Sequence, residues 1–280
     1  MRKILLILAA AILLGGTFWY FNSRDHLSGF VQQYVENGDF TTLKARYTPE
    51  QIMEINRKAL LIDSQHSYGE ASLKFLPYVL MEIKYTQSDK KSREGMMLWS
   101  LIDGEMVINT DSWEKTHGFE DAINAGATRN DFKLMHALSK TRGTATFEQL
   151  QKELHIEKET LDSWIESASS KHLVVFKGNE IQLHFQDPKL TVHPETKMSD
   201  LLVKKPYNHA QHVSGVYSIN QIQKIAKAAY GEDFAVRTSA EVFLPVYRIE
   251  VLNPDGSTFT SYWNAHTGQR MSLRYSIRGW

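Results

Sequence analysis

The spacing of hydrophobic and polar residues changes several times along this chain, and each change predicts a different element. The first run, Ile4–Phe21, is uncharged and mostly apolar. At ~1.5 Å per helical residue, it is about long enough to cross the hydrocarbon core of a bilayer. Apolar residues then follow a rough helical spacing between 26 and 62 and alternate along the chain between 73 and 110. These stretches predict a small α+β domain over residues 26–115, with a hairpin turn at Asp-Gly 103–104.

Three amphipathic helices and a hairpin are predicted next, after a helical connector at 111–130. The third helix has the clearest apolar stripe, formed by Leu161, Trp164, Ile165 and Ala168. Strands at 173–176 and 181–185 flank a Lys-Gly-Asn-Glu turn. This order and spacing of elements resembles winged-helix domains, a family with no catalytic motif to match.

The last part of the chain predicts one helix and an antiparallel sheet. A capping box at Ser218–Gln221 opens the helix, and Gly231 ends it. The strands lead into the sequence "YWNAHTGQRM", in which Asn264, Thr267 and Gly268 form a turn motif. This pattern, over about 218–273, resembles the PepSY domain, although Asn264 stands where aspartate is commoner. The resemblance implies a non-catalytic binding module outside the cytoplasm that inhibits or regulates a peptidase.

The expected fold class is therefore α+β, with four segments along the chain. They are a membrane anchor at 1–25, an α+β domain at 26–115, a winged-helix-like domain at 116–190 and a PepSY-like domain at 191–280.

The flanking charges predict which side of the membrane these segments occupy. Arg2 and Lys3 precede the apolar run, whereas Arg24 is balanced by Asp25 beyond it. The positive-inside rule keeps the N-terminus in the cytoplasm and exports the remainder, giving a single-pass cell-membrane protein anchored by residues 4–21. The alternative is a cleaved signal peptide, but the run is longer than usual and lacks a clean cleavage site.

Composition excludes several kinds of chemistry. The 280 residues contain no cysteine, which rules out disulfides, a thiol nucleophile and cysteine-ligated zinc. Lys+Arg and Asp+Glu both number 32, so net charge gives no indication of a polyanionic partner. No nucleotide-binding or hydrolase motif is present, and we expect neither an enzyme nor a cofactor.

Histidine spacing offers one weak metal hypothesis. His209 and His212 could share a helical face, with His193 as a third ligand. We expect solvated surface histidines and no metal. The basic residues Arg270, Arg274 and Arg278 align on one face if that end is a strand, and the simplest interpretation is a charged edge that resists aggregation.

The charge of the third helix bears on DNA binding. Its outward face carries Glu159, Asp162 and Glu166, which repel phosphates, so we expect no nucleic-acid partner. We expect instead that this face binds an envelope protein. The PepSY resemblance implies that this partner is an envelope peptidase under regulation. A second expected contact surface on the C-terminal sheet consists of Tyr247, Tyr262 and Trp263. The alternative is a membrane-tethered transcription regulator whose winged helix lies in the cytoplasm.

Overall fold

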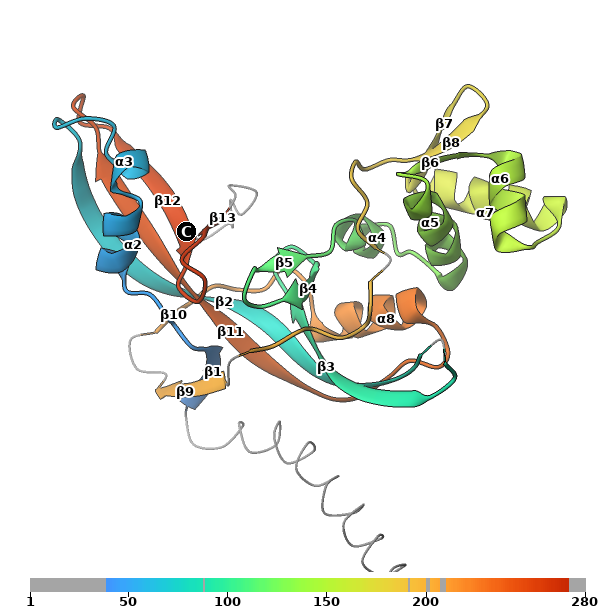
Figure 1. Cartoon of the computed structure of the whole chain (residues 1–280), viewed down its shortest axis with the longest axis horizontal. Coiled ribbons are helices and arrows are strands. Elements are labelled where there is room, and N and C mark those ends of the chain that lie inside the picture. Colours follow the sequence, from blue (N-terminus) through green and yellow to red (C-terminus); the bar gives the residue numbers. More distant parts are fainter. Residues whose placement is uncertain (1–38, 88, 191, 200–201, 207–209, 272–280) are drawn as a thin grey trace, which may run out of the picture.

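The computed structural model describes residues 39–271, apart from 88, 191, 200–201 and 207–209. It is a mixed α+β structure with two parts, an elongated sheet with helices packed on it and a smaller domain of helices and a short sheet (Figure 1). The expected anchor and its flanks, residues 1–38, lie outside the described residues. Among the residues described, no helix is long and apolar enough to span a membrane.

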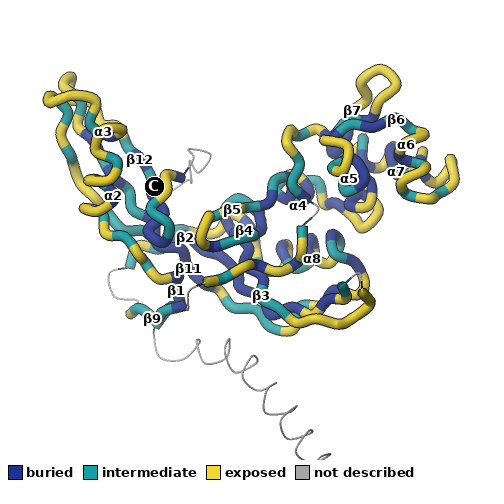
Figure 2. Tube along the Cα trace, in the orientation of Figure 1, coloured by how far each residue is buried: buried dark blue, intermediate teal, exposed yellow. Residues whose placement is uncertain are grey.

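Two long antiparallel strands form the centre of the ten-stranded sheet, β2 (Ser67–Thr86) and β11 (Ala235–Leu252). Next to β2 follow β3 (Ser92–Ser100), β4 (Met106–Asn109) and β5 (Glu114–Lys115); next to β11 follow β12 (Thr258–Asn264) and β13 (Arg270–Met271). The short strands β1 (Asp39–Leu43), β9 (Leu202–Pro206) and β10 (Gln211–His212) complete it. The middle of β2 is buried on both faces (Figure 2). Successive side chains of a strand point to opposite faces of the sheet, and here each face packs into a different core cluster.

The sheet is built from two copies of one unit, although the sequences differ. Phe-Leu-Pro at 75–77 in β2 recurs at 243–245 in β11. Tyr-Thr-Pro-Glu-Gln-Ile at 47–52 recurs as Tyr-Ser-Ile-Asn-Gln-Ile at 217–222, and each begins a helix. We name residues 39–109 repeat 1 and residues 211–271 repeat 2. Each consists of a short strand, a helix, a long strand and two further strands.

The repeats exchange their helices. The helix of repeat 1, α2 (Pro49–Ile55), continues as α3 (Arg57–Leu60) and packs on the Trp263 side of the repeat 2 sheet. The helix of repeat 2, α8 (Ile219–Tyr230), packs in the core beneath repeat 1. The short strands are exchanged in the same way, since β1 lies parallel to β11 and β10 lies parallel to β2. Each repeat therefore completes the core of the other.

The smaller domain spans residues 119–190 and is inserted between β5 and β9. Its helices are α4 (Phe119–Asn124), α5 (Arg129–Lys140), α6 (Phe147–Leu154) and α7 (Lys158–Ser170); its strands are β6 (Thr144–Thr146), β7 (Val174–Lys177) and β8 (Glu180–Leu183), in the order β6-β8-β7. We call it the inserted domain. It contacts α8 through α4 and α5, and the Arg129 guanidinium donates to the carbonyls of Ala228 and Ala229 at 3.2 and 2.6 Å. This cation therefore caps the C-terminal end of α8.

The sequence predicted individual helices and strands more accurately than the way in which distant segments pair. The stretch expected to be helical at 26–62 contains the strand β1 before α2 and α3. The connector at 111–130 holds β5 as well as helix, and β6 was not expected. The segments 26–115 and 191–280, which the sequence analysis separates, contribute strands to one sheet.

Candidate functional site

The three aromatic residues expected on the C-terminal sheet do not form one surface. Tyr247 and Trp263 are cross-strand neighbours on the face that α2 covers. Trp263 is only 4% exposed, and its indole N–H donates to Ser261 Oγ at 2.8 Å. Tyr262 lies on the opposite face, against another core cluster. The expected contact surface is therefore wrong for Trp263, which is a core residue beneath the exchanged helix.

The turn motif has the local geometry expected of it. Asn264 Oδ1 accepts hydrogen bonds from the N–H groups of His266 and Thr267 at 2.8 and 3.2 Å, which is an Asx turn. Gly268 has φ +72°, in the left-handed region that favours glycine. The carbonyl of Ala265 accepts hydrogen bonds from two backbone N–H groups just before α2, so the turn holds the exchanged helix.

Repeat 1 contains the same turn with different residues. Ser100 Oγ accepts from the N–H groups of Ile102 and Asp103 at 3.2 and 3.3 Å, and Gly104 has φ +67°. The carbonyl of Leu101 accepts from two N–H groups before α8, at 2.8 and 2.9 Å. This equivalence was not predicted, although both turns share a pattern in the sequence. At 99–104 and at 263–268 a Trp is followed by three residues, then Asp or Thr, then Gly.

A buried carboxyl group lies next to the turn of repeat 1. Glu105 is 7% exposed, and it accepts hydrogen bonds from the backbone N–H groups of Gly118 and Glu120 at 2.9 and 3.1 Å. The Thr116 hydroxyl donates to it at 2.6 Å. Burial nevertheless raises the pKa of Glu105 to about 7. This side chain joins the sheet to the start of α4 and hence to the inserted domain.

Of the histidines proposed as metal ligands, the structure describes His193 and His212, and it places them in different parts of the molecule. His212 lies among Phe40, Phe75 and Phe243, with ring centroids 4.5, 5.6 and 4.4 Å from its own. Burial lowers its pKa, so the expectation of a solvated histidine is wrong here. His209 lies outside the described residues. The part of the chain that the structure describes contains no group of three potential metal ligands.

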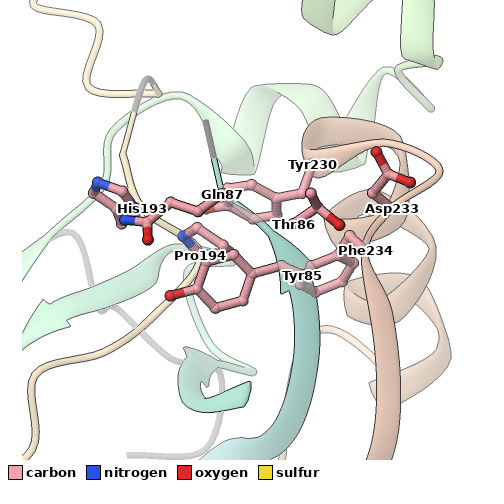
Figure 3. Close-up of a pocket in the computed structure, with 8 residues that line it drawn as sticks. All are labelled: Tyr85, Thr86, Gln87, His193, Pro194, Tyr230, Asp233 and Phe234. Carbon is pink, nitrogen blue, oxygen red and sulfur yellow. The ribbon is translucent and has the colours of Figure 1, made fainter. Parts of the chain in front are cut away.

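His193 instead lines a small pocket at the far end of β2 (Figure 3). The pocket has a volume of about 190 Å³, and its lining is Tyr85, Thr86, Gln87, His193, Pro194, Tyr230, Asp233 and Phe234. His193 and Asp233 lie at opposite ends of this group in Figure 3, so they do not converge on one point. About ten strand residues, or roughly 33 Å, separate the pocket from His212.

A larger groove lies on the inserted domain, beside the predicted acidic face of α7. Its volume is about 420 Å³, and its lining is Phe147, Asp162, Ile165, Glu166, Ser169, Ser170 and Phe176. Phe176, on β7, is 63% exposed and forms the apolar side of this groove together with Phe147 and Ile165. Phe176 was expected only as part of a wing strand, so the apolar side of this groove was not predicted.

The rim of the groove is negatively charged. It carries Asp162 and Glu166, and Glu159 lies about one turn earlier on α7. All three are exposed, and none forms an ion pair with a lysine, arginine or histidine of the described chain. An apolar surface bordered by such carboxylates repels phosphate and favours a ligand with both apolar and cationic groups. We name this feature the acidic groove.

Comparison of the chain with family models, with curated proteins and with solved structures gives no match.

Proposed function

We propose that this protein is a non-catalytic, membrane-anchored envelope protein whose domains outside the cytoplasm bind another protein. The observation that carries the proposal is the acidic groove, where the exposed Phe176 lies beside the carboxylates of Asp162 and Glu166. Exposed aromatic groups bordered by charge are typical of protein-binding surfaces. The apolar run at 4–21 and the cations before it support the anchor and its orientation.

The resemblance to the PepSY domain supports regulation of an envelope peptidase as the task. The turn that carries this resemblance occurs at 263–268, and a related turn occurs at 99–104 in the other repeat. Two PepSY-like repeats with exchanged helices would form a rigid scaffold that carries the inserted domain.

The alternative is a membrane-tethered transcription regulator with the inserted domain in the cytoplasm. The observation in its favour is the winged-helix-like order of α5, α6, α7 and the β7–β8 hairpin. The acidic face of α7 argues against it, because most affinity for DNA comes from cations that neutralise phosphates.

Reporter fusions after Trp280 test the orientation. Alkaline phosphatase, which is active only after export, should be active there, and green fluorescent protein should stay dark. The opposite pair of results would overturn the proposal and favour the regulator. Crosslinking in intact cells followed by purification of the full chain should then recover the same envelope protein repeatedly; failure to recover any would argue against protein binding.

A further inference from the structure

The acidic groove lies beside an unpaired sheet edge. The short sheet has the order β6-β8-β7, so β7 pairs with β8 on one side only, and no strand of the described chain pairs with its other side. Open edges of this kind are templates for a further strand. The side chain of Phe176 connects the two features, since it belongs to β7 and also lines the groove.

The register of β7 shows which backbone groups face the open side. The N–H of His184 donates to the carbonyl of Leu173 at 3.0 Å, so this pair is hydrogen-bonded. Antiparallel pairs alternate, which makes Val175 with Gln182 the next hydrogen-bonded pair. The N–H and C=O groups of Val174 and Phe176 therefore point away from β8. Val174 is only 1% exposed, so Phe176 is the residue whose backbone groups face an accessible edge.

We infer that β7 and the acidic groove together bind an extended, lysine- or arginine-bearing segment of a partner protein as an added strand. This inference rests on the proposed function and specifies the kind of partner. The backbone N–H and C=O of Phe176 would hydrogen-bond the segment, as in other cases of strand addition, whereas Val174 is only 1% exposed and takes no part. Alternate side chains of the segment would reach the groove, with apolar ones on Phe176 and Ile165 and cationic ones near Asp162 and Glu166.

Charge complementarity favours a cationic segment over two other occupants, DNA and a second copy of this chain. The three carboxylates along α7 attract cations at short range and repel a polyanion such as DNA. A second copy of this chain would bring an identical acidic rim against the first if two β7 edges paired. An extended cationic segment is the partner that can both hydrogen-bond to the edge of β7 and be attracted by the carboxylates of the rim.

The test uses the full chain in detergent micelles and a fluorescent, acetylated nonapeptide that alternates lysine with valine. A matched peptide has glutamate in place of lysine. Fluorescence anisotropy should show at least tenfold tighter binding of the lysine peptide. The double variant D162N/E166Q should weaken that binding about three- to tenfold, and added salt should weaken it in wild type more than in the variant. The control E70Q/E232Q neutralises two exposed acids of the sheet part and should leave binding unchanged.

Two variants at Phe176 separate strand addition from side-chain contact. Phe176→Ala removes the ring, whereas Phe176→Pro also removes an N–H that points to the open edge and takes no part in pairing with β8. Binding should fall further for the proline variant, by about threefold or more beyond the alanine variant, with unchanged circular dichroism. Equal binding by the two variants would overturn strand addition.

Other results would also overturn the inference. These are equal binding of both peptides, tighter binding of a DNA duplex than of the lysine peptide, or a chain dimer that Phe176→Pro converts to monomer. If crosslinking in cells recovers a partner while the lysine peptide fails to bind, this inference falls and the proposed function stands.

Discussion

Ile55 and Ile225 occupy equivalent positions in the two exchanged helices, yet Ile225 is 4% exposed and Ile55 is 69% exposed. The inserted domain packs against α8 through its helices α4 and α5, and Ile225 belongs to the core cluster that they share with the sheet. Among the described residues, nothing comparable covers the same flank of α2. The two repeats share one fold, but equivalent positions on their helices differ in exposure.

This asymmetry predicts different costs for the same substitution. Ile225→Ala should lower the free energy of unfolding by about 2–4 kcal/mol, because it leaves a cavity between the sheet and the inserted domain. Ile55→Ala should change it by no more than about 0.5 kcal/mol, as for other exposed positions. Urea denaturation of both variants measures the two values. A loss at Ile55 as large as at Ile225 would contradict the assignment of that flank as uncovered.

Replacing the turn glycines by alanine should lower the stability of the fold by different amounts at different positions. A methyl group at Gly104 would lie 2.7 Å from Ile123 Cδ1 and 3.1 Å from the Tyr217 ring, and at Gly268 it would lie 3.3 Å from the Tyr47 ring. Gly256 also has positive φ, but nothing lies within 4 Å. Replacement by alanine should therefore cost about 1 kcal/mol at Gly256 from backbone strain alone, more at Gly268 and most at Gly104.

Thermal unfolding of the three alanine variants checks this order. The variant G256A acts as the control for left-handed backbone without a packed neighbour. Equal losses at all three positions would show that the tyrosine rings do not restrict the turns.

The buried Glu105 predicts that stability decreases as pH rises. Its folded pKa of about 7 lies above the ordinary value of 4.5, so the folded state holds the proton over a range where the unfolded state has lost it. The contribution is complete below pH ~4.5 and is lost as pH rises through about 7, for a total on the order of 3 kcal/mol.

Glu105→Gln tests this contribution. Glutamine stays neutral and is the residue at the equivalent position 269 of repeat 2. The variant should be more stable than wild type above pH 7 and similar to it near pH 4.5, as measured by urea denaturation across that range. A constant difference between the two proteins at every pH would contradict the titration of Glu105.

The sequence predicted local elements well, because the signals for them are local. The capping box predicted at Ser218–Gln221 begins a helix in the structure. The stripe of α7 is buried at Leu161, Ile165 and Ala168 as its spacing indicates. The Asx turn at Asn264 followed from residue types alone.

What the sequence did not predict depends on pairing between distant segments. The strand β2 pairs with β11, and no local pattern specifies a partner so far along the chain. Trp263 was expected on a contact surface because the covering helix, α2, comes from the other repeat. The acidic side of the groove was predicted from Asp162 and Glu166, but Phe176 was not, since its exposure depends on how β7 lies beside α7.

His136 predicts the opposite pH dependence, this time in the inserted domain. Burial, with Arg129 and Lys140 nearby, lowers its pKa from 6.5 to about 4. The folded state therefore keeps the neutral ring where the unfolded state gains a proton. This contribution is complete above pH ~6.5 and is lost as pH falls through about 4, for a total on the order of 3 kcal/mol.

His136→Leu should remove this sensitivity, because the ring packs near Phe132, at 5.9 Å between centroids, and its Nε2 has no hydrogen-bond partner to lose. The variant should gain stability over wild type steadily as pH falls from 6.5 to 4, as measured by thermal unfolding. It should leave unchanged the loss of stability towards pH 7 assigned to Glu105, because the two residues lie in different parts of the molecule. If His136→Leu also changed the loss of stability towards pH 7, the protonation of Glu105 and that of His136 would be coupled, through α4, which joins the sheet to the inserted domain.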